Sequence, residues 1–155
     1  MKNSLQSLTF AGRPDTVQEK HFRKFLIITV AGSFALLVHL AFIPAFLAVG
    51  VTFMGYLNIA SVAAWALGIY LNFKGKHSLA IQVLCTEVLI HSVCATAFMG
   101  TSVGFQYYLW SISALAIINT QLNVTYSTVY SFFFILVFGL LYLFFGDVQY
   151  RLCSA

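Results

Sequence analysis

The stretch EVLIH, residues 87–91, places a carboxylate and an imidazole four residues apart inside an apolar run. Residues at positions i and i+4 of a helix share one face, so Glu87 and His91 can share a proton or hold one polar ligand. An acidic residue at the centre of a membrane-spanning helix costs about 2.5 to 3.5 kcal/mol on insertion scales. The pair therefore indicates an interior polar site in which Glu87 has a partner or a proton.

Other residue patterns exclude several kinds of chemistry. The glutamate and histidine do not form the His-Glu-x-x-His motif of a metalloprotease, and the chain has no Gly-x-Ser-x-Gly elbow, Walker loop or paired-carboxylate site. Three cysteines lack the spacing of a zinc or redox motif: Cys85, Cys94 and Cys153. We therefore expect no catalytic residue, no metal site and no cofactor, so the chain by itself is not expected to be an enzyme.

The composition indicates an integral membrane protein. The 155 residues are 61% hydrophobic and 17% aromatic but only 8% charged, whereas an average soluble domain carries about 25% charged residues. The lysines and arginines cluster beside apolar runs, as membrane-flanking residues do, and no basic stripe is present that could bind nucleic acid.

Five apolar segments have or approach the length of about 20 residues that a membrane crossing needs. They are residues 25–46, 55–73, 78–98, 105–118 and 127–145. Pro44 could kink or end the first segment, and the short fourth segment either extends into NTQLN or lies tilted. The predicted fold is an all-α polytopic bundle with about five crossings. A cytoplasmic polar tail at 1–20 precedes the transmembrane domain at 21–146, and a short tail follows at 147–155.

The positive residues predict the orientation of the chain. KHFRKF precedes the first segment and KGKH follows the second, whereas the turns at GVTFMG and GTSVG are uncharged. By the positive-inside rule the N-terminus is cytoplasmic, and the expected location is the inner (plasma) membrane of the cell, which the chain crosses several times.

Depth in the membrane then groups the buried polar residues. A rise of 1.5 Å per residue puts Glu87 about 13 Å, His91 about 20 Å and His39 about 21 Å from the cytoplasmic side. Asn58 and Gln106 begin helices that enter from the outer side. These five residues are expected to line one polar pocket that opens toward the outside. Three uses stay open for these residues: hydrogen bonding between helices, ligand sensing, or a proton or ion pathway. Level histidines can also bind haem, but two lone histidines are weak evidence for it.

Several segments together resemble a known family. NIASV, FKGKHSLA, EVLIHSVCAT, MGTSVG and GFQYYLW occur in this order between residues 58 and 110. Over residues 21–145 the chain resembles the N-terminal six-helix membrane domain that precedes bacterial nucleotide cyclases, both class III adenylate/guanylate cyclases and GGDEF diguanylate cyclases. The matching motif positions are Glu87, His91, Gly104, Phe105, Gln106, Tyr107 and Tyr108. Tyr107 and Tyr108 are equally typical of an aromatic belt at the membrane surface.

The resemblance implies a sensory and anchoring domain whose helices position a cytoplasmic cyclase dimer and respond to a small-molecule ligand. The chain departs from this pattern because it ends after the fifth predicted helix, so we expect an incomplete six-helix unit without the catalytic part. A small proton-coupled transport or channel subunit, or a purely structural membrane protein, are the alternative interpretations.

Overall fold

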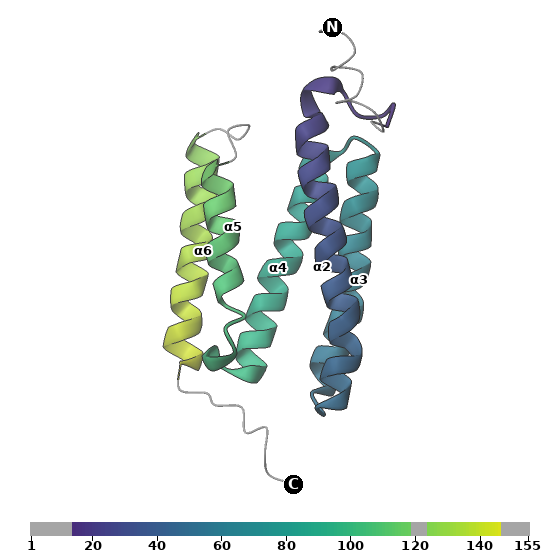
Figure 1. The fold of residues 1–155 in the computed structure, drawn as a ribbon. Coiled ribbons are helices and arrows are strands. Elements are labelled where there is room, and N and C mark those ends of the chain that lie inside the picture. Colours follow the sequence, from purple (N-terminus) through teal and green to yellow (C-terminus); the bar gives the residue numbers. More distant parts are fainter. Residues whose placement is uncertain (1–13, 119–123, 147–155) are drawn as a thin grey trace, which may run out of the picture. The chain divides into compact units, whose positions relative to one another are not determined.

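A computed structural model of the chain describes residues 14–118 and 124–146. All regular structure within these ranges is helical, which confirms the all-α prediction (Figure 1). The elements are η1 (Glu19–His21), α2 (Phe22–Ala48), α3 (Thr52–Phe73), α4 (His77–Met99), η2 (Thr101–Val103), α5 (Tyr107–Ile118) and α6 (Val124–Phe145).

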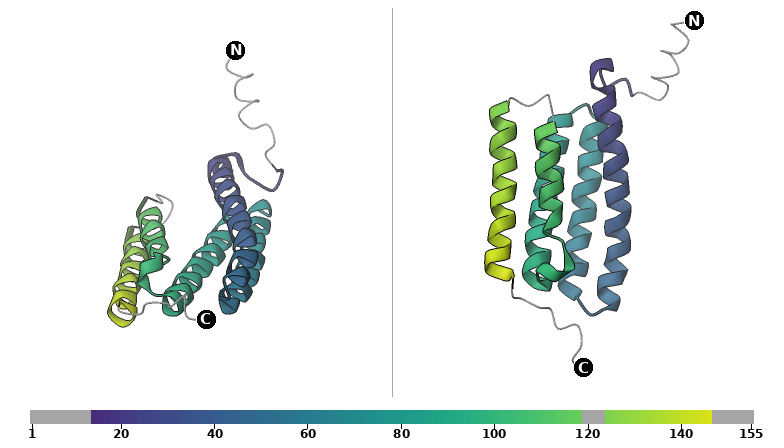
Figure 2. Two further views of the ribbon diagram at one scale, coloured as in Figure 1. Left: turned by 60° about the horizontal axis from the view of Figure 1, so that its bottom comes forward. Right: turned by 60° about the vertical axis from the view of Figure 1, so that its left-hand side comes forward.

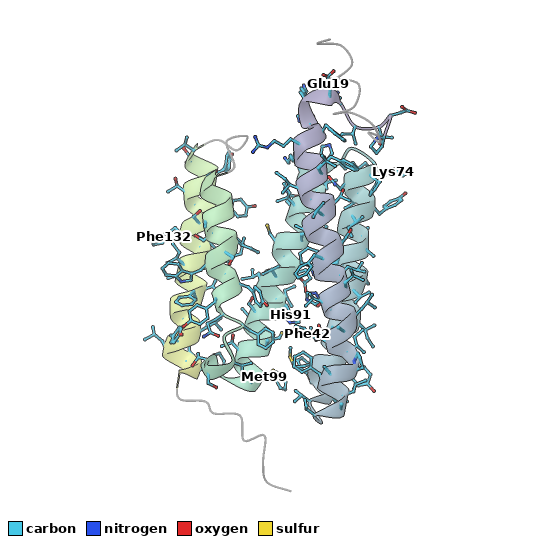
Figure 3. The ribbon with its side chains drawn as sticks, in the orientation of Figure 1. Glu19, Phe42, Lys74, His91, Met99 and Phe132 are labelled. Carbon is cyan, nitrogen blue, oxygen red and sulfur yellow. The ribbon has the colours of Figure 1, made fainter. Side chains whose placement is uncertain are left out.

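Among the described residues, four stretches are long and apolar enough to cross a membrane: Glu19–Ala48, Thr52–Phe73, His77–Met99 and Val124–Phe145. Large apolar side chains along them are exposed, including Phe34 at 70% and Phe132 at 67%, and Figure 3 draws Phe132 on the outside of α6. Lipid chains are the environment that makes such a surface stable. The chain is therefore a membrane protein, and the predicted segments agree with these four helices to within a few residues.

Two local expectations from the sequence can be compared with the helices. Pro44 lies inside α2, which continues to Ala48, so the proline does not end the first crossing. Helix α5 has 12 residues, a length of about 18 Å, whereas the hydrocarbon core is about 30 Å thick. The fifth crossing therefore stays a prediction, and its expected extension over residues 119–123 lies outside the described residues.

The chain divides into two compact units, residues 1–84 and 85–155. The first unit contains α2 and α3, which pack along each other, and the start of α4 (Figure 2). Small residues allow close approach of the helices in this unit. A Cβ atom added to Gly55 would lie 2.8 Å from Leu47 Cδ2, and one added to Gly68 would lie 2.4 Å from Leu84 Cδ2. This use of glycine is common in membrane helix packing, where close contact replaces the hydrophobic effect.

A segment before α2 is folded onto the helix ends of the first unit. Val17 is fully buried and packs with Phe22 and Phe25, and the Thr16 hydroxyl donates to the Phe73 carbonyl oxygen at the end of α3. The described part of the expected polar tail thus packs against both helices. The remaining tail residues, 1–13, and the C-terminal tail, 147–155, lie outside the described residues.

The second unit contains most of α4 with α5 and α6. Its core is Leu109, Phe134 and Leu141, against which α4 packs Cys85, Leu89 and Val93. Helices α5 and α6 are antiparallel, and two reciprocal hydrogen bonds join them: Ser113 Oγ donates to Ser131 O at 3.2 Å, and Ser131 Oγ donates to Ser113 O at 2.9 Å. Side-chain to backbone bonds of this kind satisfy both hydroxyls where water is absent.

Candidate functional site

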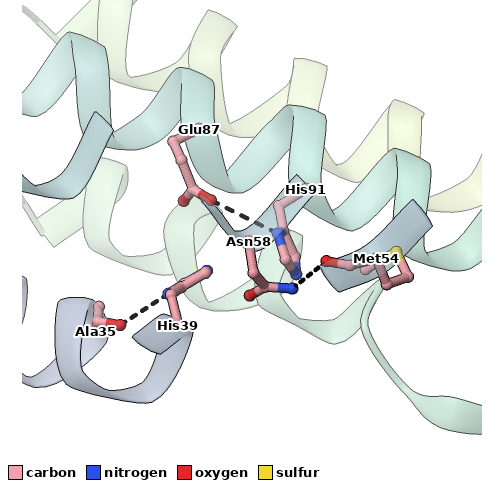
Figure 4. A network of polar contacts seen from close by, with 6 residues as sticks. All are labelled: Ala35, His39, Met54, Asn58, Glu87 and His91. Carbon is pink, nitrogen blue, oxygen red and sulfur yellow. Dashed lines mark hydrogen bonds and ion pairs between the residues drawn. The ribbon is translucent and has the colours of Figure 1, made fainter. Parts of the chain in front are cut away.

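The acid and the imidazole predicted from the sequence lie together at the middle of α4. Glu87 Oε1 is 3.7 Å from His91 Nδ1, and both residues are buried, at 8% and 5% exposure (Figure 4). Glu87 is ten residues after His77 and twelve before Met99, hence about 15 and 18 Å from the two ends of the helix. The pair is therefore at the depth at which a charge costs most.

The pair occupies the face of α4 opposite the row of side chains that packs on the core of the second unit. A helix turns 100° per residue, and Cys85, Leu89 and Val93 form the row that packs on the α5 and α6 core. Glu87 is rotated by about 160° from both Cys85 and Leu89. The ring of Phe105, just before α5, lies 5.7 Å from the His91 ring, centroid to centroid. The core of the second unit and the polar pair thus use different faces of one helix.

The separation within the pair decides what it can do chemically. A strong charge-assisted N–H···O bond is about 2.7 to 2.9 Å long, so the 3.7 Å between Glu87 Oε1 and His91 Nδ1 is the distance of an ion pair and not of a direct hydrogen bond. One proton on the pair makes it neutral overall, either as a carboxylic acid with a neutral imidazole or as a carboxylate with an imidazolium. The pair can therefore gain or lose a proton, or bind a small cationic or hydrogen-bonding ligand.

Further buried polar atoms of the second unit have no hydrogen-bond partner among the described residues. They are the hydroxyl oxygens of Ser92 and Thr96 and the Oε1 atom of Gln106, and all three residues are fully buried. Such atoms cost about 1 to 3 kcal/mol each unless water or a ligand satisfies them. Ser92 and Thr96 were not among the residues predicted from the sequence, although their place in the apolar run HSVCAT was the available signal.

Gln106 and Tyr107 form a network at the start of α5. Gln106 Nε2 donates to Thr101 O at 2.7 Å and to Tyr142 Oη at 3.2 Å, and the hydroxyls of Tyr107 and Tyr142 are 2.9 Å apart. Tyr107 and Tyr108 are both more than half exposed, as aromatic residues at a membrane surface are expected to be. This network connects the ends of α5 and α6.

His39 and Asn58 belong to the first unit, where each bonds to its own helix (Figure 4). His39 Nδ1 donates to Ala35 O at 2.7 Å, which leaves Nε2 as the other proton-binding atom of the ring. Asn58 is fully buried and donates from Nδ2 to Met54 O at 2.7 Å. That these two residues share a pocket with Glu87, His91 and Gln106 stays a prediction from depth.

A second polar group, which was not predicted from the sequence, joins three helices of the first unit. The buried Asn72 donates from Nδ2 to Phe25 O at 2.9 Å and to Thr29 Oγ1 at 3.0 Å. Its Oδ1 atom is 2.6 Å from His77 Nδ1. Because the Phe25 carbonyl can only accept, the amide orientation is fixed and His77 Nδ1 must donate. The His21 ring lies 5.8 Å from that of His77.

Comparison with known proteins found no family model, no curated protein and no solved structure that matches this chain. The resemblance to cyclase membrane domains therefore remains a prediction from the sequence motifs.

Proposed function

We propose that this chain is a membrane-embedded sensory and anchoring domain and that Glu87 and His91 form its input site. The observation that supports the proposal is the 3.7 Å acid and imidazole pair, buried at the centre of a helix long enough to span the membrane.

An acid and imidazole pair at this depth is suited to convert a chemical input into a change of helix packing. A proton gained or lost there, or a ligand bound, changes the local charge in a low dielectric, where charge interactions are strong. An allosteric coupling of about 1 to 3 kcal/mol between two sites is typical, and the cost of one charge at the membrane centre is of this size. Relief of that cost in one helix arrangement but not in another would shift the population between them.

The proposed output enzyme, the dimeric assembly and the orientation in the membrane rest on the sequence alone. The motifs EVLIHSVCAT and GFQYYLW resemble those of the membrane domains that precede bacterial nucleotide cyclases. This resemblance supports a nucleotide cyclase as the output and a homodimer as the working assembly. The basic residues before α2 and after α3 support a cytoplasmic N-terminus, and the resemblance to cyclase membrane domains supports a bacterial inner membrane. The signal is then carried from a small-molecule ligand or proton at Glu87 and His91 to the cytoplasmic side.

The test replaces Glu87 by glutamine at the native locus, which removes the ionisable group and keeps the side-chain shape. Thr86→Ser is the matched control, because Thr86 is the exposed neighbour on the same helix. We expect Glu87→Gln to change cellular cyclic AMP, cyclic GMP or cyclic di-GMP while the amount of membrane-inserted protein stays equal. Unchanged levels of all three nucleotides, with only a lower melting temperature, would reject sensing in favour of a structural role.

Proton-coupled transport is the second candidate, and the ionisable pair itself is the observation that favours it. A carboxyl group and an imidazole at the middle of a membrane-spanning helix can each take up and release a proton. The buried hydroxyls of Ser92 and Thr96 do not extend a path from the pair, because they are rotated by about 140° and 180° from Glu87 and lie on the opposite face of α4. In proteoliposomes with an imposed pH gradient, transport predicts a proton flux that Glu87→Gln abolishes and Thr86→Ser preserves, whereas a sensory domain predicts no flux above empty vesicles.

A further inference from the structure

Two basic runs that are 50 residues apart in the sequence lie together at one end of the first unit. Lys20, Arg23 and Lys24 are at the start of α2, and Lys74 and Lys76 follow α3. The packing of Phe25 on Phe73, edge to face at 5.0 Å, joins these helix ends. Asn72 ties them further through its bond to Phe25 O. Figure 3 shows Lys74 and Glu19 at this same end.

The charge at this end is strongly positive. Among the residues that the structure describes here, five cationic side chains and two acidic ones, Asp15 and Glu19, leave a net +3 (5 − 2) before any histidine is protonated. Lys24 is half-buried and acts electrostatically on His77, the first residue of α4. The positive end of the α4 dipole adds to the same field. The site therefore combines fixed cations with a helix start, and it favours an anion.

The surroundings of these cations indicate an anion that carries acyl chains. The side faces of α2 and α3 next to the basic end expose Leu26, Ile27 and Tyr70. The Lys74 ammonium lies 5.4 Å from the centre of the Tyr70 ring, above an apolar face. Because the cations stand at the ends of membrane-spanning helices, they are at headgroup depth, where lysine stems lie along apolar surface and ammonium groups reach the phosphates.

We propose that this end of the first unit binds the phosphate of an anionic phospholipid, with Lys74 and Lys76 on one side and Lys20, Arg23 and Lys24 on the other. The acyl chains lie along the exposed faces of α2 and α3. The binding is independent of the sensory role of Glu87 and His91, because it needs only the membrane location and the packing of the two helix ends. Its function is to hold α2 against the α3 to α4 turn at the membrane surface.

The experiment uses the full chain in nanodiscs of phosphatidylcholine with and without phosphatidylglycerol. Native mass spectrometry measures the lipid that stays bound, and thermal unfolding measures its effect. The variants are Lys74→Gln with Lys76→Gln, and a control that keeps the charge, Lys74→Arg with Lys76→Arg. At a factor of about 5.5 per lysine, the glutamine variant, which lacks two lysines, is expected to retain about 30-fold less phosphatidylglycerol. The arginine control should resemble the wild type.

Two results would overturn the proposal. One is equal retention of phosphatidylglycerol by the wild type and the glutamine variant. The other is stabilisation of the wild type by inorganic phosphate to the same extent as by phosphatidylglycerol, which would show a site for soluble anions. If the glutamine variant does not fold, Lys20→Gln with Arg23→Gln tests the α2 side of the same site, and the same loss of lipid is expected.

Discussion

Replacement of Asn72 by alanine should be one of the most destabilising polar changes in the first unit. Asn72 makes three hydrogen bonds, to Phe25 O, Thr29 Oγ1 and His77 Nδ1. A side-chain hydrogen bond in a membrane protein contributes about 0.6 kcal/mol on average, so three contribute about 2 kcal/mol. The His77 N–H that loses its acceptor adds a penalty of about 1 kcal/mol or more, because His77 is buried. The expected loss is about 2 to 4 kcal/mol.

Asn58→Ala is the matched control, since Asn58 is equally buried on the same helix and makes one hydrogen bond, to Met54 O. Its expected cost is about 0.6 kcal/mol. The free energy of unfolding is measured for both variants in mixed micelles by titration with a denaturing detergent. If Asn72→Ala costs no more than Asn58→Ala, the three bonds of Asn72 do not stabilise the helix ends and the reasoning is wrong.

Two further predictions concern close packing and depth. Gly68→Ala should lower stability by about 1 to 3 kcal/mol, because its new Cβ would lie 2.4 Å from Leu84 Cδ2. Leu84→Ala in the same chain should recover part of the loss, and Gly139→Ala, where nothing lies within 4 Å, should be neutral or slightly stabilising in a thermal melt. The predicted common pocket can be tested with the double substitution His39→Cys and His91→Cys in a variant whose native cysteines have been removed. If the two positions share a pocket, a short thiol cross-linker should join the two new cysteines. Failure to cross-link would reject that pocket.

The long helices were predictable because the bilayer sets their length. Each crossing needs a run of apolar residues that few other structures use, so α2, α3, α4 and α6 begin and end within a few residues of the predicted segments. The sequence predicts a crossing less well where a segment is apolar but shorter than a membrane crossing needs. Phe105 belongs to the predicted fourth crossing, yet α5 begins at Tyr107 and has 12 residues. Residues 105–118 are apolar enough for a crossing, but their composition does not show where the helix starts; the structure shows that it starts at Tyr107.

The candidate site was predictable only in part, because sequence spacing gives depth and the shared face of one helix but not contacts between helices. Glu87 and His91 are four residues apart, so their contact follows from helix geometry alone. Asn72 at the end of an apolar run is indistinguishable in sequence from an ordinary helix terminus. Its bonds to Phe25 and His77 depend on the packing of α2, α3 and α4.

The polar residues of the membrane-spanning helices differ in their depth in the membrane and in the contacts that they make. Asn72 stands at a helix end, where water is near, and still makes three bonds of 3.0 Å or less, which is what a structural role requires. Glu87 and His91 stand at the centre of α4, where a polar group costs most, and their mutual contact is 3.7 Å. Replacement of a buried ion pair by apolar residues of similar size is often neutral or stabilising, so packing alone does not require an ionisable pair at this depth. The pair at the costlier depth is better explained by a proton or ligand that it binds, and this difference is why the input site is proposed there.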